Sequence, residues 1–215
     1  MESSGSDTPP PDLNDTDGAI CSIERDMQIA LELMECGDVQ QAIHAYDSIL
    51  LESPTHLPAL KSRIVALTLA SRYESALIDA RIVMELDPSD SEICWIIAGL
   101  LRRLYGEDSE EVMQAYETAY KIDPLNPYLR IERADILRSH NRHTEAITEY
   151  AEVAETADSE EILLEARYKE GCVAMVLERT EQALKAFSTV LEISPGYEEA
   201  ELMYQLLNQE NRHLA

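Results

Sequence analysis

Residues that end helices recur at a nearly constant interval along this chain. Pro54 and Pro88 lie 34 residues apart, Pro124 follows after 36, Asp158 after 34 and Pro195 after 37. Between these positions, apolar residues recur every three or four residues in segments of about a dozen, which is the periodicity of amphipathic helices. Each interval has room for two helices, so the repeat indicates a stack of helical hairpins.

Equivalent positions of the five intervals carry similar side chains. The first helices share a column of mostly small residues, at which two helices can approach closely: Ala30, Ile64, Ala98, Ala134 and Gly171. The second helices share a small column, followed four residues later by a column of mostly aromatic rings that we expect to fill the space between hairpins. These two columns are Ala42, Ala76, Val112, Ala146 and Ala183, and Tyr46, Ala80, Tyr116, Tyr150 and Phe187.

The columns resemble the tetratricopeptide repeat family, whose pattern of Trp, Leu-Gly and Tyr, then Ala, Phe and a closing Pro has a period of about 34 residues. The resemblance extends from Ile23 to about Gly196. It implies an all-α fold, a right-handed superhelical α-solenoid of about five helix-turn-helix hairpins with a C-terminal capping helix. The implied repeat domain spans residues 20–211, with repeats at about 23–56, 57–90, 91–126, 127–160 and 164–197 and the capping helix at 197–210.

Several local features refine this expectation. Asn126 is predicted to cap a helix that begins at Pro127. Insertions at residues 105–108 and 158–161 are expected to make the third hairpin turn protrude and to change the pitch before the fifth hairpin. At three positions where the family more often has an aliphatic residue, we expect long side chains to lay their stems on the core and put their heads in water. These residues are Arg63, Arg133 and Glu170.

The N-terminal segment, residues 1–19, is rich in Ser, Pro, Asp and Gly. It contains one large aliphatic side chain, Leu13, so burial cannot offset the entropy lost on ordering. We expect a disordered acidic tail.

The charge of the chain limits its partners. Seventeen Lys and Arg against 42 Asp and Glu give a net charge of −25, which disfavours nucleic acid and anionic membranes as ligands. The acidity fits a basic partner, but solubility and a salty cytoplasm, taken together, explain it better.

The spacing of the cysteines and the absence of known motifs bear on the cellular location of the protein and on whether it is an enzyme. The four cysteines are far apart, the first twenty residues have no secretory signal, and no segment has membrane-spanning length, so we expect a cytoplasmic protein. No phosphate-binding loop, HExxH or GxSxG motif occurs. His140 and His143 share a hairpin turn without a nearby Cys, which favours a solvated turn over a metal site. We therefore expect no enzyme activity, no cofactor and no metal.

The resemblance also implies where a ligand binds, because in this family the first helices line a concave groove that accepts an extended peptide or a partner helix. Projecting the groove-facing columns onto this chain predicts a peptide-binding set of apolar, aromatic and basic residues. The set is Met27, Leu31, Lys61, Val65, Trp95, Arg102, Tyr128, Ile131, Arg138, Tyr168 and Met175, with Met34, Leu69, Arg103, Asp135 and Cys172 in the same columns.

Three alternatives stay open at this stage. The predicted peptide-binding set is either a binding surface or part of the packed core. Trp95 lies in the groove, or in the hairpin core if the frame moves by one residue and places Arg102 in the first-helix column of Leu33, Leu67 and Leu137. Arg102, Arg103 and Arg138 either bind an acidic partner or pair with acids of their own helices. The Lys, Asn and Arg set with which chaperone adaptors of this family grip a C-terminal carboxylate is missing, since Val65 stands where Lys61 would need its Asn.

The sequence thus predicts a protein-protein interaction scaffold or adaptor that binds a partner peptide or helix in its groove. The alternative is a structural subunit that docks into a larger complex through its convex or end faces. Neither interpretation identifies the partner or the oligomeric state.

The excess of acidic residues predicts that salt stabilises the fold. The Debye length falls from about 30 Å at 0.01 M salt to about 8 Å at 0.15 M, which screens repulsion among surface carboxylates. The melting temperature, followed by circular dichroism, should rise over this range. A melting temperature that does not rise would show that surface repulsion is unimportant.

Overall fold

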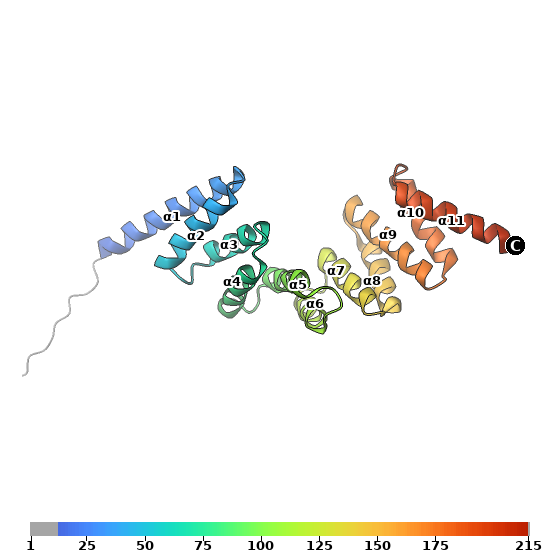
Figure 1. The fold of residues 1–215 in the computed structure, drawn as a ribbon, viewed down its shortest axis with the longest axis horizontal. Coiled ribbons are helices and arrows are strands. Elements are labelled where there is room, and N and C mark those ends of the chain that lie inside the picture. Colours follow the sequence, from blue (N-terminus) through green and yellow to red (C-terminus); the bar gives the residue numbers. More distant parts are fainter. Residues whose placement is uncertain (1–12, 215) are drawn as a thin grey trace, which may run out of the picture. The chain divides into compact units, whose positions relative to one another are not determined.

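A computed structural model describes residues 13–214, and within this range the chain forms eleven α-helices and no strand (Figure 1). The first five helices are α1 (Leu13–Glu35), α2 (Val39–Glu52), α3 (Leu57–Leu69), α4 (Tyr73–Leu86) and α5 (Ser91–Tyr105). The next six are α6 (Glu110–Ile122), α7 (Pro127–Ser139), α8 (His143–Thr156), α9 (Glu160–Val176), α10 (Thr180–Ile193) and α11 (Glu198–Leu214). The predicted all-α solenoid of five hairpins and a final helix is confirmed.

The chain divides into two compact units after Pro88. Unit 1 contains the hairpins α1–α2 and α3–α4, and unit 2 contains α5–α6, α7–α8 and α9–α10 followed by α11. Within each unit, the second helix of a hairpin packs against the first helix of the next one. Across the insertion at residues 158–161, α8 packs closely against α9.

Helix ends follow the signals in the sequence. Each of the five markers, from Pro54 to Pro195, lies two residues after the last residue of a second helix. The Asn126 side chain accepts hydrogen bonds from the backbone N–H groups of Tyr128 and Leu129, so the predicted cap is confirmed. Ser159 caps α9 in the same way, through the N–H of Ile162.

Helix α1 begins at Leu13, so residues 13–19 of the predicted disordered tail are helical. The last proline before this helix is Pro11, so no proline interrupts the helix between residues 13 and 19. Residues 1–12 of the predicted tail lie outside the described part of the chain.

The predicted columns form the core. All ten side chains of the two second-helix columns are buried, and the rings of Tyr46, Tyr116, Tyr150 and Phe187 are completely so. The small column of the first helices is buried as well. Ala200 and Leu207 of α11 are buried, while Leu202 and Leu206 face solvent, so α11 closes the end of unit 2.

Gly171 shows how closely the two helices of a hairpin approach. A Cβ at this position of α9 would lie 2.7 Å from two ring carbons of Phe187 in α10. Gly99, in α5, has no atom within 4 Å of the place a Cβ would occupy. At Gly171, α9 thus lies directly against the buried Phe187 ring of α10.

The long side chains at the family's aliphatic positions do not reach into water as expected. Arg63 of α3 pairs with Asp47 of α2 and Asp79 of α4, which lie 16 residues before and 16 residues after it. Arg133 of α7 pairs with Glu117 and Glu149 at the same spacing.

Glu170 of α9 is similarly buried, with Arg167 and Gln182 as partners. The expectation was wrong because acids on the neighbouring second helices pair with Arg63 and Arg133, while Arg167 and Gln182 donate hydrogen bonds to Glu170. Arg63 and Arg133 consequently tie successive hairpins together.

Two glycine substitutions test the packing within hairpins. Gly171→Ala should destabilise the protein, because overpacking costs about 1–3 kcal/mol and outweighs the gain of about 1 kcal/mol in helix propensity. Gly99→Ala should gain that propensity without a clash and raise the free energy of unfolding. Urea denaturation followed by circular dichroism measures both. Equal stabilisation by the two substitutions would contradict the close approach at Gly171.

Candidate functional site

Two aromatic rings stack on the first helices of unit 2. The centroids of Trp95 in α5 and Tyr128 in α7 are 6.3 Å apart, with 16° between the ring planes. Tyr128 is 45% exposed and Trp95 is half-buried. Exposed aromatic side chains are enriched at the centres of protein interfaces, so this pair is a candidate contact for a ligand.

The burial of Leu101 and Arg102 decides between the two alignments of the repeat that place Trp95 differently. Leu101 is 4% exposed and occupies the core position that Leu67 and Leu137 hold in other hairpins, whereas the Arg102 side chain is partly exposed. The alternative frame, which would bury Arg102 among leucines, is wrong.

Glu132 of α7 connects the aromatic pair to Arg102. Its Oε2 atom accepts hydrogen bonds from the Trp95 indole N–H and, at 3.1 Å, from the Tyr116 hydroxyl. Its Oε1 atom lies 3.9 Å from Nη1 of Arg102. Burial, followed by the nearby Glu132 charge, raises the pKa of Tyr116, so this hydroxyl remains a neutral donor.

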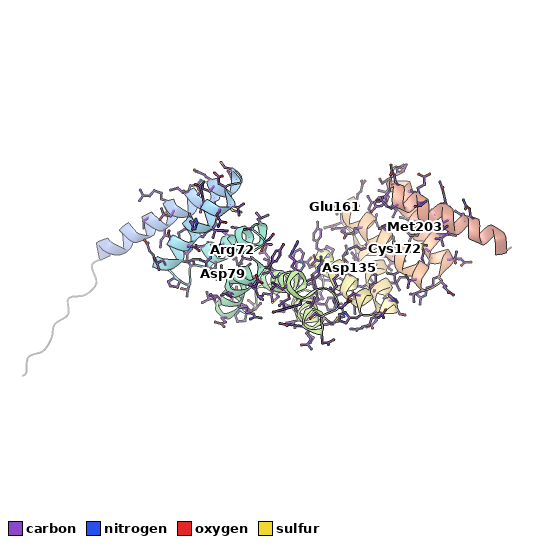
Figure 2. The ribbon with its side chains drawn as sticks, viewed as in Figure 1. Arg72, Asp79, Asp135, Glu161, Cys172 and Met203 are labelled. Atoms are coloured by element: carbon purple, nitrogen blue, oxygen red, sulfur yellow. The ribbon has the colours of Figure 1, made fainter. Side chains whose placement is uncertain are left out.

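Asp135, one turn further along α7, is the centre of a second group. It accepts hydrogen bonds from the Tyr150 hydroxyl at 2.7 Å and from Lys169 Nζ of α9 at 2.6 Å, and thereby joins α7 to α9 (Figure 2). Nη2 of Arg138 lies 4.0 Å away. Burial lowers the pKa of Lys169, but its bonds to Asp135 and Glu165 outweigh this effect, so the pKa is raised and the amine stays charged.

Tyr168 lies further along the same side of unit 2, where it is half-buried. Its ring packs against Phe187 and Tyr197, with centroids 6.0 and 5.2 Å away. Burial, with the neighbouring Cys172, raises the pKa of Tyr168 to about 12. Tyr168 therefore supports the hairpin core as well as the surface.

The structure brings some of the predicted residues together and separates others. Trp95, Arg102 and Tyr128 meet around Glu132, and Arg138 lies beside Asp135. The Met175 side chain is half-buried on α9. The predicted residues of unit 1 are half-buried or exposed on α1 and α3, and they form a separate group: Met27, Leu31, Lys61 and Val65.

Ile131 does not belong to the surface. It is 2% exposed, three residues before the buried Ala134 on the core side of α7, and cannot contact a ligand. The prediction for this residue is wrong because the stripe of α7 that faces the core includes it.

Sequence reasoning did not identify Glu132 or Lys169. One signal was available for Glu132, which follows Tyr116 by 16 residues, the same spacing at which Arg63 and Arg133 find their acids. Lys169 gave no comparable signal, because its partner Asp135 lies on the previous first helix.

Two further features of the described residues concern membranes and metals. None of the helices is both long enough and apolar enough to cross a bilayer. In the part of the chain that the structure covers, no three His, Cys, Asp or Glu side chains are grouped so as to hold a metal ion.

This arrangement defines a class, an α-solenoid of helical hairpins with an aromatic and charged surface on its first helices. Residues 101–162 match the sequence model of the tetratricopeptide repeat family. This match and the fold confirm the resemblance of the chain to that family.

Solved structures agree with this conclusion. YrrB, described as a TPR protein with an unusual peptide-binding site, is 16% identical, with a TM-score of 0.69 over 87% of this chain and 97% of its own. MamA is 17% identical, with a TM-score of 0.70 over 82% and 94%. PilW, a type IV pilus biogenesis factor, is 16% identical, with a TM-score of 0.67 over 87% and 85%. At these identities the likeness establishes the fold, and a search of curated proteins finds no match.

The hydrogen-bonding role of Glu132 can be tested by substituting this residue. Glu132→Leu leaves the buried Tyr116 hydroxyl without an acceptor and should lower the free energy of unfolding by about 1–3 kcal/mol. Glu132→Gln keeps an acceptor oxygen and should cost less. Urea denaturation followed by the fluorescence of Trp95, the single Trp of the chain, measures both. Equal losses in the two variants would contradict the hydrogen-bonding role of Glu132.

Proposed function

We propose that this protein is an interaction scaffold that binds a partner peptide or helix along the first helices of its hairpins. The partly exposed Trp95–Tyr128 pair carries this proposal. Two stacked rings, one of them held by the Trp95–Glu132 hydrogen bond, form an apolar surface that loses little entropy on binding. The ligand is expected to place an apolar side chain against these rings.

Unit 1 supports the proposal independently. Val65 and Leu69, one turn apart on α3, are 50% and 63% exposed, and Leu31 of α1 is 43% exposed. A helix that keeps aliphatic side chains in water on one face typically meets another molecule there. The peptide-binding site of YrrB is consistent with this use of the fold.

Binding rather than catalysis is proposed because the sequence contains none of the nucleotide, zinc or hydrolase motifs considered above. The side chains around Glu132 and Asp135 are joined in stable hydrogen bonds and ion pairs. A cytoplasmic location and a protein partner, without nucleic acid or membrane, remain part of the proposal.

A second candidate function is assembly into a larger complex through the second helices. On α4, Ile78 is 61% exposed and Ile82 follows one turn later. The other second helices have polar residues at both equivalent positions: His44 and Ser48, Gln114 and Thr118, Thr148 and Glu152, and Lys185 and Thr189. The apolar stripe is therefore specific to α4 and favours a contact there.

The two candidates are separated by single substitutions. Dodecapeptides selected by the full chain from a random phage-displayed library should bind Tyr128→Ala about 5- to 100-fold more weakly, as expected for the loss of a central aromatic contact. Leu51→Ala, which removes an 85% exposed side chain from α2, should bind like the unchanged protein. Fluorescence anisotropy gives the dissociation constants, and circular dichroism confirms folding.

If the library yields no peptide, the scaffold proposal is wrong. Loss of cellular complexes in Ile78→Asp, with their retention in Tyr128→Ala, would instead support assembly through α4.

A further inference from the structure

The arginines that lie beside carboxylates fall into two groups. One group forms hydrogen bonds to carboxylate oxygens at 2.5–3.1 Å and consists of Arg63, Arg130, Arg133, Arg142 and Arg167. Arg102 and Arg138, on the first helices of unit 2, instead lie 3.9 and 4.0 Å from their acids, beyond hydrogen-bonding distance. The second group therefore retains donor capacity on the surface where the proposed ligand lies.

The two groups differ because the acids beside Arg102 and Arg138 already accept hydrogen bonds from other side chains. Glu132 accepts from the Trp95 indole and the Tyr116 hydroxyl, and Asp135 accepts from the Tyr150 hydroxyl and Lys169. Both tyrosine rings are completely buried, so these acceptors are oriented by the hairpin core. The guanidinium groups are drawn toward the acids by charge but do not share their hydrogen bonds.

The local charge also differs from that of the chain. Arg102, Arg138 and Lys169 stand against Glu132, Asp135 and Glu165, with Glu107 also near Arg102, so this cluster is close to neutral in a protein of net charge −25. Its carboxylates accept hydrogen bonds from within the protein, whereas Arg102 and Arg138 form no hydrogen bond to a carboxylate of the described residues. An anionic group meets less repulsion here than over the acidic average of the chain.

We propose that Arg102 and Arg138 bind a carboxylate of the ligand peptide, while Trp95 and Tyr128 contact an apolar side chain of the same segment. This inference rests on the proposed function. A planar guanidinium binds a carboxylate through two parallel hydrogen bonds, which gives both affinity and orientation. The ligand class is thus an extended peptide with an acidic and an apolar residue at a defined spacing.

The spacing follows from the positions of these residues on their helices. Arg102 comes seven residues after Trp95 in α5, and Arg138 ten residues after Tyr128 in α7, which corresponds to about 10–15 Å along a helix axis. An extended peptide covers that distance in about three to five residues. Acidic residues three to five positions from an aromatic or leucine residue should therefore be preferred.

The test uses the full chain and acetylated, amidated dodecapeptides with one Phe and an Asp, Glu, Asn or Gln three to five positions away. The fluorescence of Trp95 reports binding directly. Acidic peptides should bind about tenfold or more tightly than their amide counterparts, as expected for a charge-assisted hydrogen bond. Peptides with a free C-terminal carboxylate instead of the acidic side chain show which source of carboxylate the arginines accept.

The variants Arg102→Gln and Arg138→Gln should lose the preference for acid over amide. Arg142→Gln provides the matched control, since it removes the same charge from a similarly exposed arginine that pairs with Glu145 at the start of α8, and it should keep the preference. Because the comparison of peptides needs no variant, a folding defect in Arg102→Gln leaves the test decisive.

Equal affinity for acidic and amide peptides would overturn the role of the arginines and leave peptide binding intact. Failure of all peptides to bind would overturn the proposed function together with this inference.

Discussion

The aromatic ring that four of the five hairpins bury on their second helix determines both the packing and the surface of this protein. Tyr46, Tyr116, Tyr150 and Phe187 are completely buried at equivalent positions. Phe187 lies so close to the opposite helix that Gly171 leaves no space for a Cβ. Tyr116 and Tyr150 extend further and donate hydrogen bonds to Glu132 and Asp135, which both lie on α7. The same residues that close the hairpins thus hold the carboxylates of the candidate site.

The distribution of charge follows from this arrangement. Arg63 and Arg133 pair with acids of the second helices on both sides and act as links between successive hairpins. On the first helices of unit 2, tyrosine hydroxyls, the Trp95 indole and the Lys169 amine occupy the acids, so Arg102 and Arg138 form no hydrogen bond to them. A chain with a large excess of acids can keep cations available only if its nearby carboxylates have other partners.

Much of the fold could be predicted because its signals are local. Pro54 and Pro195 each follow a helix end, Asn126 caps a helix, and the small and aromatic columns are buried. These features depend on helix periodicity and on backbone groups within one turn. The prediction for Ile131 was wrong because a projection of columns cannot separate the edge of the core stripe from the surface beside it.

Other features depend on side chains from different hairpins. The pairing of Arg63 with Asp47 and Asp79 joins three helices, and the expectation of solvated heads was wrong because periodicity gives no distance between charges. The group around Glu132 brings together α5, α6 and α7, and Lys169 reaches back from α9 to Asp135.

The sequence by itself determined the hairpins, their boundaries and which residues fill them, because helix formation and core burial are governed by near neighbours and a regular period. Only the tertiary structure decided which charges pair and which arginines keep their donors, because those contacts join residues far apart in the chain and depend on how closely successive helices pack.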